Sequence, residues 1–112
     1  MRKSAFTIIC IICLPFVSCK KNKNNHIAVC DGSSPTYNSY VQSIITSNCS
    51  GCHGVGSNNG DFSTYAKLST VTSNGKFEKE VLTNQSMPQS SPLPDADLDK
   101  LKCWIEAGFP EN

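Results

Sequence analysis

The hydrophobic positions of this chain form one unbroken run near the start and several helical patterns beyond it. The run, AFTIICIICLPFV, covers residues 5–17 and follows the basic pair Arg2 and Lys3. It is too short to cross a bilayer comfortably, but it fits the apolar core of a secretory signal peptide. Beyond residue 34 the apolar residues recur at the 3.6-residue spacing of helices. The pattern therefore predicts an all-α domain behind a signal peptide.

The first predicted helix of the domain begins near residue 34. Ser34 suits the N-cap and Pro35 suits the first helical position. One face of this helix carries four apolar residues and a cysteine: Tyr37, Val41, Ile44, Ile45 and Cys52. We expect this face to be buried.

A second amphipathic helix is predicted at the end of the chain. Asp95 and Asp97 suit its start through capping and the helix dipole, while Gly108 and Pro110 suit its end. One arc of this helix is apolar, with Leu98, Leu101, Trp104 and Ile105.

Two shorter helices are expected between these. Ser63 would cap one of them, and the other covers residues 76–82. The first would carry Tyr65, Ala66 and Leu68, and the second would turn Phe77, Val81 and Leu82 inward.

The end of the apolar run indicates the compartment. Cys19 follows the small residue Ser18 in V-S-C-K-K, which resembles a bacterial lipoprotein signal. The resemblance implies that Cys19 carries lipid and anchors the mature chain to the inner or outer membrane of the cell envelope, facing the periplasm. An ordinary secretory signal cleaved nearby is the alternative. We assign residues 1–18 to the signal peptide, 19–29 to a lipidated polar tether, and 30–112 to one folded domain.

Charge changes this picture little. The whole chain carries 10 basic and 9 acidic residues, but from residue 24 onward 5 lysines face the same 9 acids, a balance of −4. Nucleic-acid binding, which calls for a basic domain, is not expected. Such an acidic domain would suit a basic redox partner in the periplasm or membrane.

The central chemistry lies in C-S-G-C-H, residues 49–53. This spacing is the attachment signature of a c-type haem. The thiols of Cys49 and Cys52 would form thioethers with the haem vinyl groups, and His53 would ligate the iron. A zinc site, a redox dithiol and a structural disulfide are the alternatives. Zinc requires four ligands, and a redox dithiol normally follows a strand in a βαβ unit.

The sixth iron ligand is sought among the remaining residues. Mature c-type electron carriers commonly bind iron through His and Met. Met87 is the one methionine that survives removal of the signal, and it lies in a polar segment before Pro88. We expect Met87 to be the ligand, with His26 of the tether as its competitor.

The remaining cysteines pair by elimination. If Cys19 is acylated and the haem takes Cys49 and Cys52, only Cys30 and Cys103 are left. Exported proteins tend to oxidise spare thiols. Cys103 also lies opposite the apolar arc of its helix, so we expect residues around Cys30 to pass over the back of that helix. Two free, buried thiols are the alternative.

The order of these parts resembles the small class I cytochrome c domains of bacterial envelope proteins. The shared parts are C-S-G-C-H-G, then N-G-D-F-S-T-Y-A-K-L, then S-M-P, and then L-P-D-A-D-L-D-K-L-K-C-W-I-E-A-G-F-P. The resemblance covers residues 35–111. It implies a cytochrome c-like fold, in which the N- and C-terminal helices cross and short helices surround one covalent haem c.

The function expected from this ligand set is electron transfer rather than catalysis. With His53 and Met87 on the iron, no coordination position is open for a substrate. The protein would be an electron carrier, alone or as a subunit of a larger oxidoreductase. Two alternatives remain: a haem sensor or haem enzyme in which Met87 leaves the iron, and a lipoprotein without haem.

Overall fold

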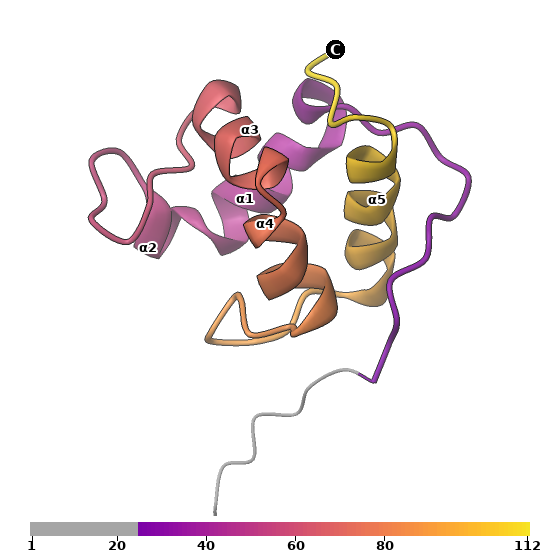
Figure 1. Ribbon diagram of the computed structural model, residues 1–112. Helices are drawn as coiled ribbons and strands as arrows, with labels where there is room; N and C mark the ends of the chain where they lie inside the picture. The colour runs from indigo at the N-terminus through magenta and orange to yellow at the C-terminus, as the bar shows by residue number, and fades with distance from the viewer. Residues whose placement is uncertain (1–24) are drawn as a thin grey trace, which may run out of the picture.

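The computed structural model describes residues 25–112, and this part of the chain is helical and contains no strand (Figure 1). The predicted signal peptide and the lipidation site Cys19 lie outside the described residues. The elements are the π-helical turns η1 (Tyr37–Val41) and η2 (Lys79–Thr83), and the α-helices α1 (Gln42–Asn48), α2 (Ser50–His53), α3 (Tyr65–Ser73), α4 (Lys76–Glu78) and α5 (Asp95–Glu106). None of the helices in the described part is long and apolar enough to cross a membrane.

Turn η1 and helix α1 form the first predicted helix, but its cap differs from the prediction. Thr36, not Ser34, is the N-cap. The Thr36 hydroxyl accepts a hydrogen bond from the Ser39 N–H at 3.1 Å, and the Ser39 hydroxyl accepts one from the Thr36 N–H at 2.9 Å. This reciprocal capping box satisfies two N–H groups at once, which explains why the helix begins two residues later than predicted.

The predicted apolar faces form the core. The first and last helices bury Tyr37, Val41, Ile44, Ile45, Leu98, Leu101 and Trp104. Ile105 is only half-buried. The prediction that Cys52 shares the buried face is wrong, because α1 ends at Asn48 and α2 is a separate turn that leaves Cys52 exposed.

The two middle helices are also present. Thr64 rather than Ser63 caps α3, and its hydroxyl accepts the Lys67 N–H. Helix α4 continues directly into η2. Three residues of these two elements, Phe77, Val81 and Leu82, are buried as expected.

Helix α5 packs against η1, the first helical element of the domain. The Tyr40 hydroxyl donates to the Asp97 carboxylate at 2.6 Å. The Pro110 carbonyl accepts both the Tyr37 N–H and the Trp104 indole N–H, each at 2.9 Å. The segment after α5 therefore ties the first helix to the last one.

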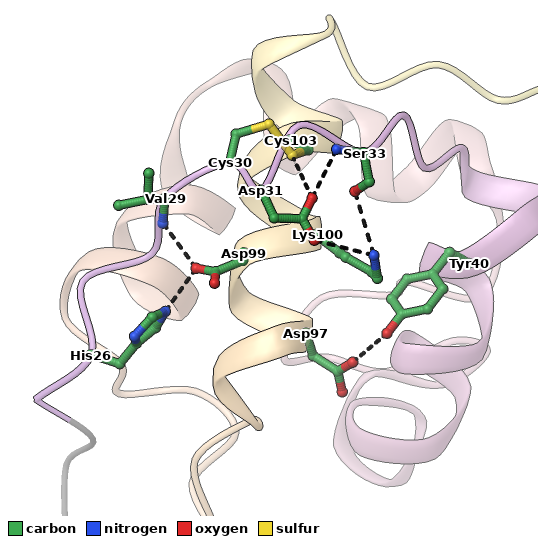
Figure 2. A network of polar contacts seen from close by, with 10 residues as sticks. All are labelled: His26, Val29, Cys30, Asp31, Ser33, Tyr40, Asp97, Asp99, Lys100 and Cys103. Atoms are coloured by element: carbon green, nitrogen blue, oxygen red, sulfur yellow. Dashed lines mark hydrogen bonds and ion pairs between the residues drawn. A yellow bond between two sulfur atoms is a disulfide. The ribbon is translucent and has the colours of Figure 1, made fainter.

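Residues 26–31, which we call the strap, run along the outer side of α5 (Figures 1 and 2). The sulfur atoms of Cys30 and Cys103 are joined at 2.00 Å, the pairing predicted by elimination. The Asp99 carboxylate accepts the Val29 N–H at 2.9 Å and contacts the His26 ring at 2.7 Å. Residues 26–29 were expected in the polar tether, but these contacts make them part of the folded domain.

A pH titration of His26 tests how the strap is held. The hydrogen bond to Asp99 is the largest cause that raises the His26 pKa above 6.5, with the charges of Asp95 and Asp99 adding to it. Protonation therefore strengthens this contact. Its contribution to stability is fully present below pH 6.5 and is lost as the pH rises through the folded-state pKa.

We expect an NMR titration to give a His26 pKa above 6.5 in the wild type, and a lower value in Asp99→Asn. Asp97→Asn is the matched control, because Asp97 lies on the same helix but bonds to Tyr40. Equal His26 pKa values in the wild type and Asp99→Asn would show that the contact does not hold the strap.

Candidate functional site

A cavity of about 540 Å³ opens among the shorter helices, beside the C-x-x-C-H turn. All four residues expected to hold haem line it: Cys49, Cys52, His53 and Met87. The rest of the lining combines apolar residues, including Phe62, Val71, Phe77 and Val81, with polar residues, including Asn48, Lys76 and Glu80. These residues come from α2, α3, α4, η2 and the loops on either side, which Figure 1 shows gathered on one side of the molecule.

Helix α2 places the C-x-x-C-H residues at one edge of the cavity. The Cys49 carbonyl accepts the N–H groups of Cys52 at 3.1 Å and His53 at 2.8 Å, so the motif closes into one helical turn. Both cysteines are free thiols, with Cys49 half-buried and Cys52 exposed. Burial raises the pKa of the Cys49 thiol to about 11, which keeps it protonated at neutral pH.

The His53 ring is oriented by the loop that follows it. Its Nδ1 lies 3.0 Å from the Gly60 carbonyl oxygen, and the ring stacks on Phe62 with centroids 4.3 Å apart. Because a carbonyl oxygen only accepts, this hydrogen bond places the hydrogen on Nδ1 and leaves the lone pair on Nε2. A histidine that ligates a metal through Nε2 has this arrangement.

Asp61 organises that loop. Its carboxylate accepts the Gly56 N–H at 2.8 Å and the Ser63 N–H at 2.9 Å, and it pairs with Lys67 at 2.6 Å. The Lys67 ammonium is the largest cause that holds the Asp61 pKa well below its usual range. Gly60 and Asp61 belong to the segment that carries the family resemblance, but neither was assigned a role; the turn pair Asn59–Gly60 is the local signal for this loop.

Met87 lies in the loop between η2 and α5, and it lines the same cavity as the C-x-x-C-H turn. The N–H groups of Ser86 and Met87 both point to the Glu80 carbonyl, at 2.9 and 3.3 Å. The Ser86 hydroxyl also bonds to the Glu80 carboxylate and is the largest cause that lowers the Glu80 pKa. His26, the competing ligand, does not line this cavity and instead contacts Asp99.

The arrangement suits a large cofactor better than a single metal ion. A cavity of this size is within the range of about 300–1,000 Å³ typical of small-molecule and cofactor sites. Across residues 25–112 the ligand atoms of Cys49, Cys52 and His53 do not converge on one point as a zinc site requires. The group whose ligand atoms do converge within residues 25–112 is Cys30, Asp31 and Cys103, which lies outside the cavity. Both of its sulfurs are in the disulfide. The donor set and the apolar part of the lining therefore fit a covalently attached haem.

Comparisons of the chain with protein-family models, with curated proteins and with solved structures find no match.

Substitution of Gly60 tests whether the loop positions His53. Gly60 has φ +104°, and an added Cβ would lie 3.4 Å from the Phe62 ring and 3.6 Å from His53 Nδ1. Gly32 is a matched control, because its φ is +85°, nothing lies within 4 Å of its added Cβ, and it is outside the loop that orients His53. An alanine at a left-handed position costs about 1–2 kcal/mol.

We expect both alanine variants to lower the free energy of unfolding in urea, with Gly60→Ala losing more than Gly32→Ala. Only Gly60→Ala should also shift the His53 ring resonances. Equal losses and unchanged His53 resonances would contradict the positioning role of this loop.

Proposed function

We propose that the protein is an electron carrier that holds one covalent haem c, with His53 and Met87 as the axial ligands. One observation carries the proposal: the two cysteines, the histidine and the methionine chosen from the sequence all line the same cavity. They come from two segments that are far apart along the chain. A chance C-x-x-C-H motif would not be expected to share a cavity with Met87.

Each residue has a defined part in this proposal. The sulfur atoms of Cys49 and Cys52 would tether the haem through thioethers. The Nε2 of His53, freed by the Gly60 carbonyl, would bind one face of the iron, and the Met87 sulfur the other. A haem bound in this way supplies a one-electron Fe(II)/Fe(III) couple.

The lining residues would control the surroundings of the couple. Phe62, Val71 and Phe77 give the cavity apolar walls, and burial of the haem against them together with a sulfur ligand would favour a higher potential. Because protein ligands take both axial positions, the site leaves no place for a substrate. The protein would therefore be a carrier and not an enzyme, although it fits as a subunit of a larger oxidoreductase.

We also propose that the all-α domain has a cytochrome c-like fold. Contacts at the first and last helices support this: the Tyr40 hydroxyl bonds to Asp97 of α5, and the Tyr37 N–H bonds to the Pro110 carbonyl of the segment after α5. The short helices α2, α3 and α4 contribute to the cavity lining, as the resemblance implies for the haem surroundings.

Replacement of Met87 tests the ligand set against the haem sensor or haem enzyme alternative. The oxidised wild type should show the weak near-infrared charge-transfer band of a sulfur–iron bond, and its reduced form should bind carbon monoxide poorly at neutral pH. Met87→Ala should remove the band and open the iron to carbon monoxide. Ser91→Ala, in the same loop but exposed and outside the cavity lining, is the control and should resemble the wild type.

An unchanged band in Met87→Ala would show that another residue is the ligand. Fast carbon monoxide binding to the reduced wild type would instead favour the sensor or enzyme alternative. Protein matured in its own periplasm without haem absorbance would overturn the proposal itself.

We further propose that lipid on Cys19 anchors the protein to an envelope membrane, where it meets a redox protein partner. The resemblance of V-S-C-K-K to a lipoprotein signal supports the anchor. Cys19→Ser should move the protein from the membrane fraction to the soluble fraction or block its processing. Cys13→Ser, within the apolar run, is the control. Normal processing together with equal membrane association in both variants would refute lipidation at Cys19.

A further inference from the structure

Gln85 is an unusual residue for its place in the loop that carries Met87. Its side chain is only 8% exposed, and its backbone is left-handed with φ +48°. Its amide Nε2 donates to the His26 carbonyl at 2.7 Å, while its amide oxygen has no hydrogen-bond partner within residues 25–112. An apolar residue would fill this space without a buried unpaired oxygen. The hydrogen bond to His26 is therefore the distinctive contribution of the glutamine.

The acceptor of this bond belongs to the strap, which is fixed from several sides. The Cys30–Cys103 disulfide attaches one part of the strap to α5, and Asp99 binds both His26 and Val29 (Figure 2). The His26 carbonyl is thus held in place relative to α5. Gln85 uses it as an anchor for a loop from a different part of the chain.

The same loop has a second anchor immediately after Gln85. The N–H groups of Ser86 and Met87 bond to the Glu80 carbonyl of η2. Gln85 therefore attaches the loop to the strap, while Ser86 and Met87 attach it to the helix that lines the cavity. Met87 follows Gln85 by two residues. A shift of Gln85 would therefore reach Met87 through a short stretch of backbone that is fixed at the strap and at η2.

From this geometry we infer that Gln85 is a positioning residue, through which the disulfide-pinned strap holds the Met87 loop against the cavity. The part that concerns the iron ligand rests on the proposed function. The part that concerns the loop does not depend on a cofactor. Loosening the strap should then loosen Met87, although the strap lies on α5 and contributes none of the residues that line the site.

Gln85→Asn provides the most direct test. Asparagine keeps the amide and tolerates a left-handed backbone, but it is one methylene shorter and should not reach the His26 carbonyl. Loss of one hydrogen bond of ordinary strength changes an equilibrium about two- to ten-fold. In the natively matured protein we expect the Ser86 and Met87 amides to exchange hydrogen faster by that factor. Imidazole, used as a probe, should bind the oxidised haem more tightly by a similar factor.

Two matched variants separate positioning from general loss of stability. Gln42→Asn makes the same chemical change at an exposed site on α1 and should alter neither measurement. Asp99→Asn weakens the strap without touching the Met87 loop and should change both measurements in the same direction as Gln85→Asn. Asp97→Asn is its control. If Gln85→Asn fails to fold, the comparison of Asp99→Asn with Asp97→Asn decides.

Unchanged exchange of the Ser86 and Met87 amides in Gln85→Asn and Asp99→Asn would overturn the inference. Faster exchange with unchanged imidazole affinity would overturn the link to the iron ligand. Failure of the proposed function is distinguishable, because it appears as a wild type without haem or as a Met87→Ala variant with an unchanged iron spectrum. The exchange measurement decides the role of Gln85 in either case.

Discussion

Burial of α5 from two sides is the constraint on which the rest of this structure depends. One side carries Trp104, Leu98 and Leu101, which are almost fully buried in the core. The other side carries Cys103 and Asp99, which bind the strap. A domain of about 80 residues has a marginal core, so a disulfide across 73 residues of sequence is a substantial addition to it. By chain entropy it contributes up to about 4 kcal/mol.

This scaffold leaves the cavity on the side of the core away from the strap. Phe77 connects the two regions, because it lines the cavity and its ring meets Trp104 edge to face at 6.5 Å. Phe62 continues the same aromatic series from Phe77 to His53. The candidate ligand is thus packed, through two phenylalanines, against the buried face of the last helix. A cofactor in the cavity would extend the core and be fixed by it.

The periodic part of the sequence predicted the all-α class and most of the buried core. The faces built on Tyr37, Val41, Leu98 and Trp104 are buried as expected, because apolar spacing responds directly to burial. The Cys30–Cys103 pairing followed from the small number of cysteines. Helix starts were less predictable, since neighbouring hydroxyl residues compete for the cap and local geometry selects Thr36 and Thr64.

The residues that arrange the site could not be predicted in the same way. The carbonyl of Gly60 acts through the path of the backbone, and any residue type has a carbonyl. Asp61 acts through three contacts that exist only when its loop is closed. Gln85 meets His26 across 59 residues of sequence, and no periodicity links a loop to a segment that resembles a tether. The sequence thus indicated the residues proposed to hold the haem, but not those that position them.

The state of the cysteines in protein matured in its own periplasm is the most direct test of the haem proposal. The measurement is the intact mass after denaturation, reduction and alkylation, followed by peptide mapping. The proposal predicts the mass of one retained haem, with Cys49 and Cys52 unmodified by the alkylating agent and Cys30 and Cys103 alkylated after reduction. A chain without the added mass, in which all four of these cysteines are alkylated, would contradict it.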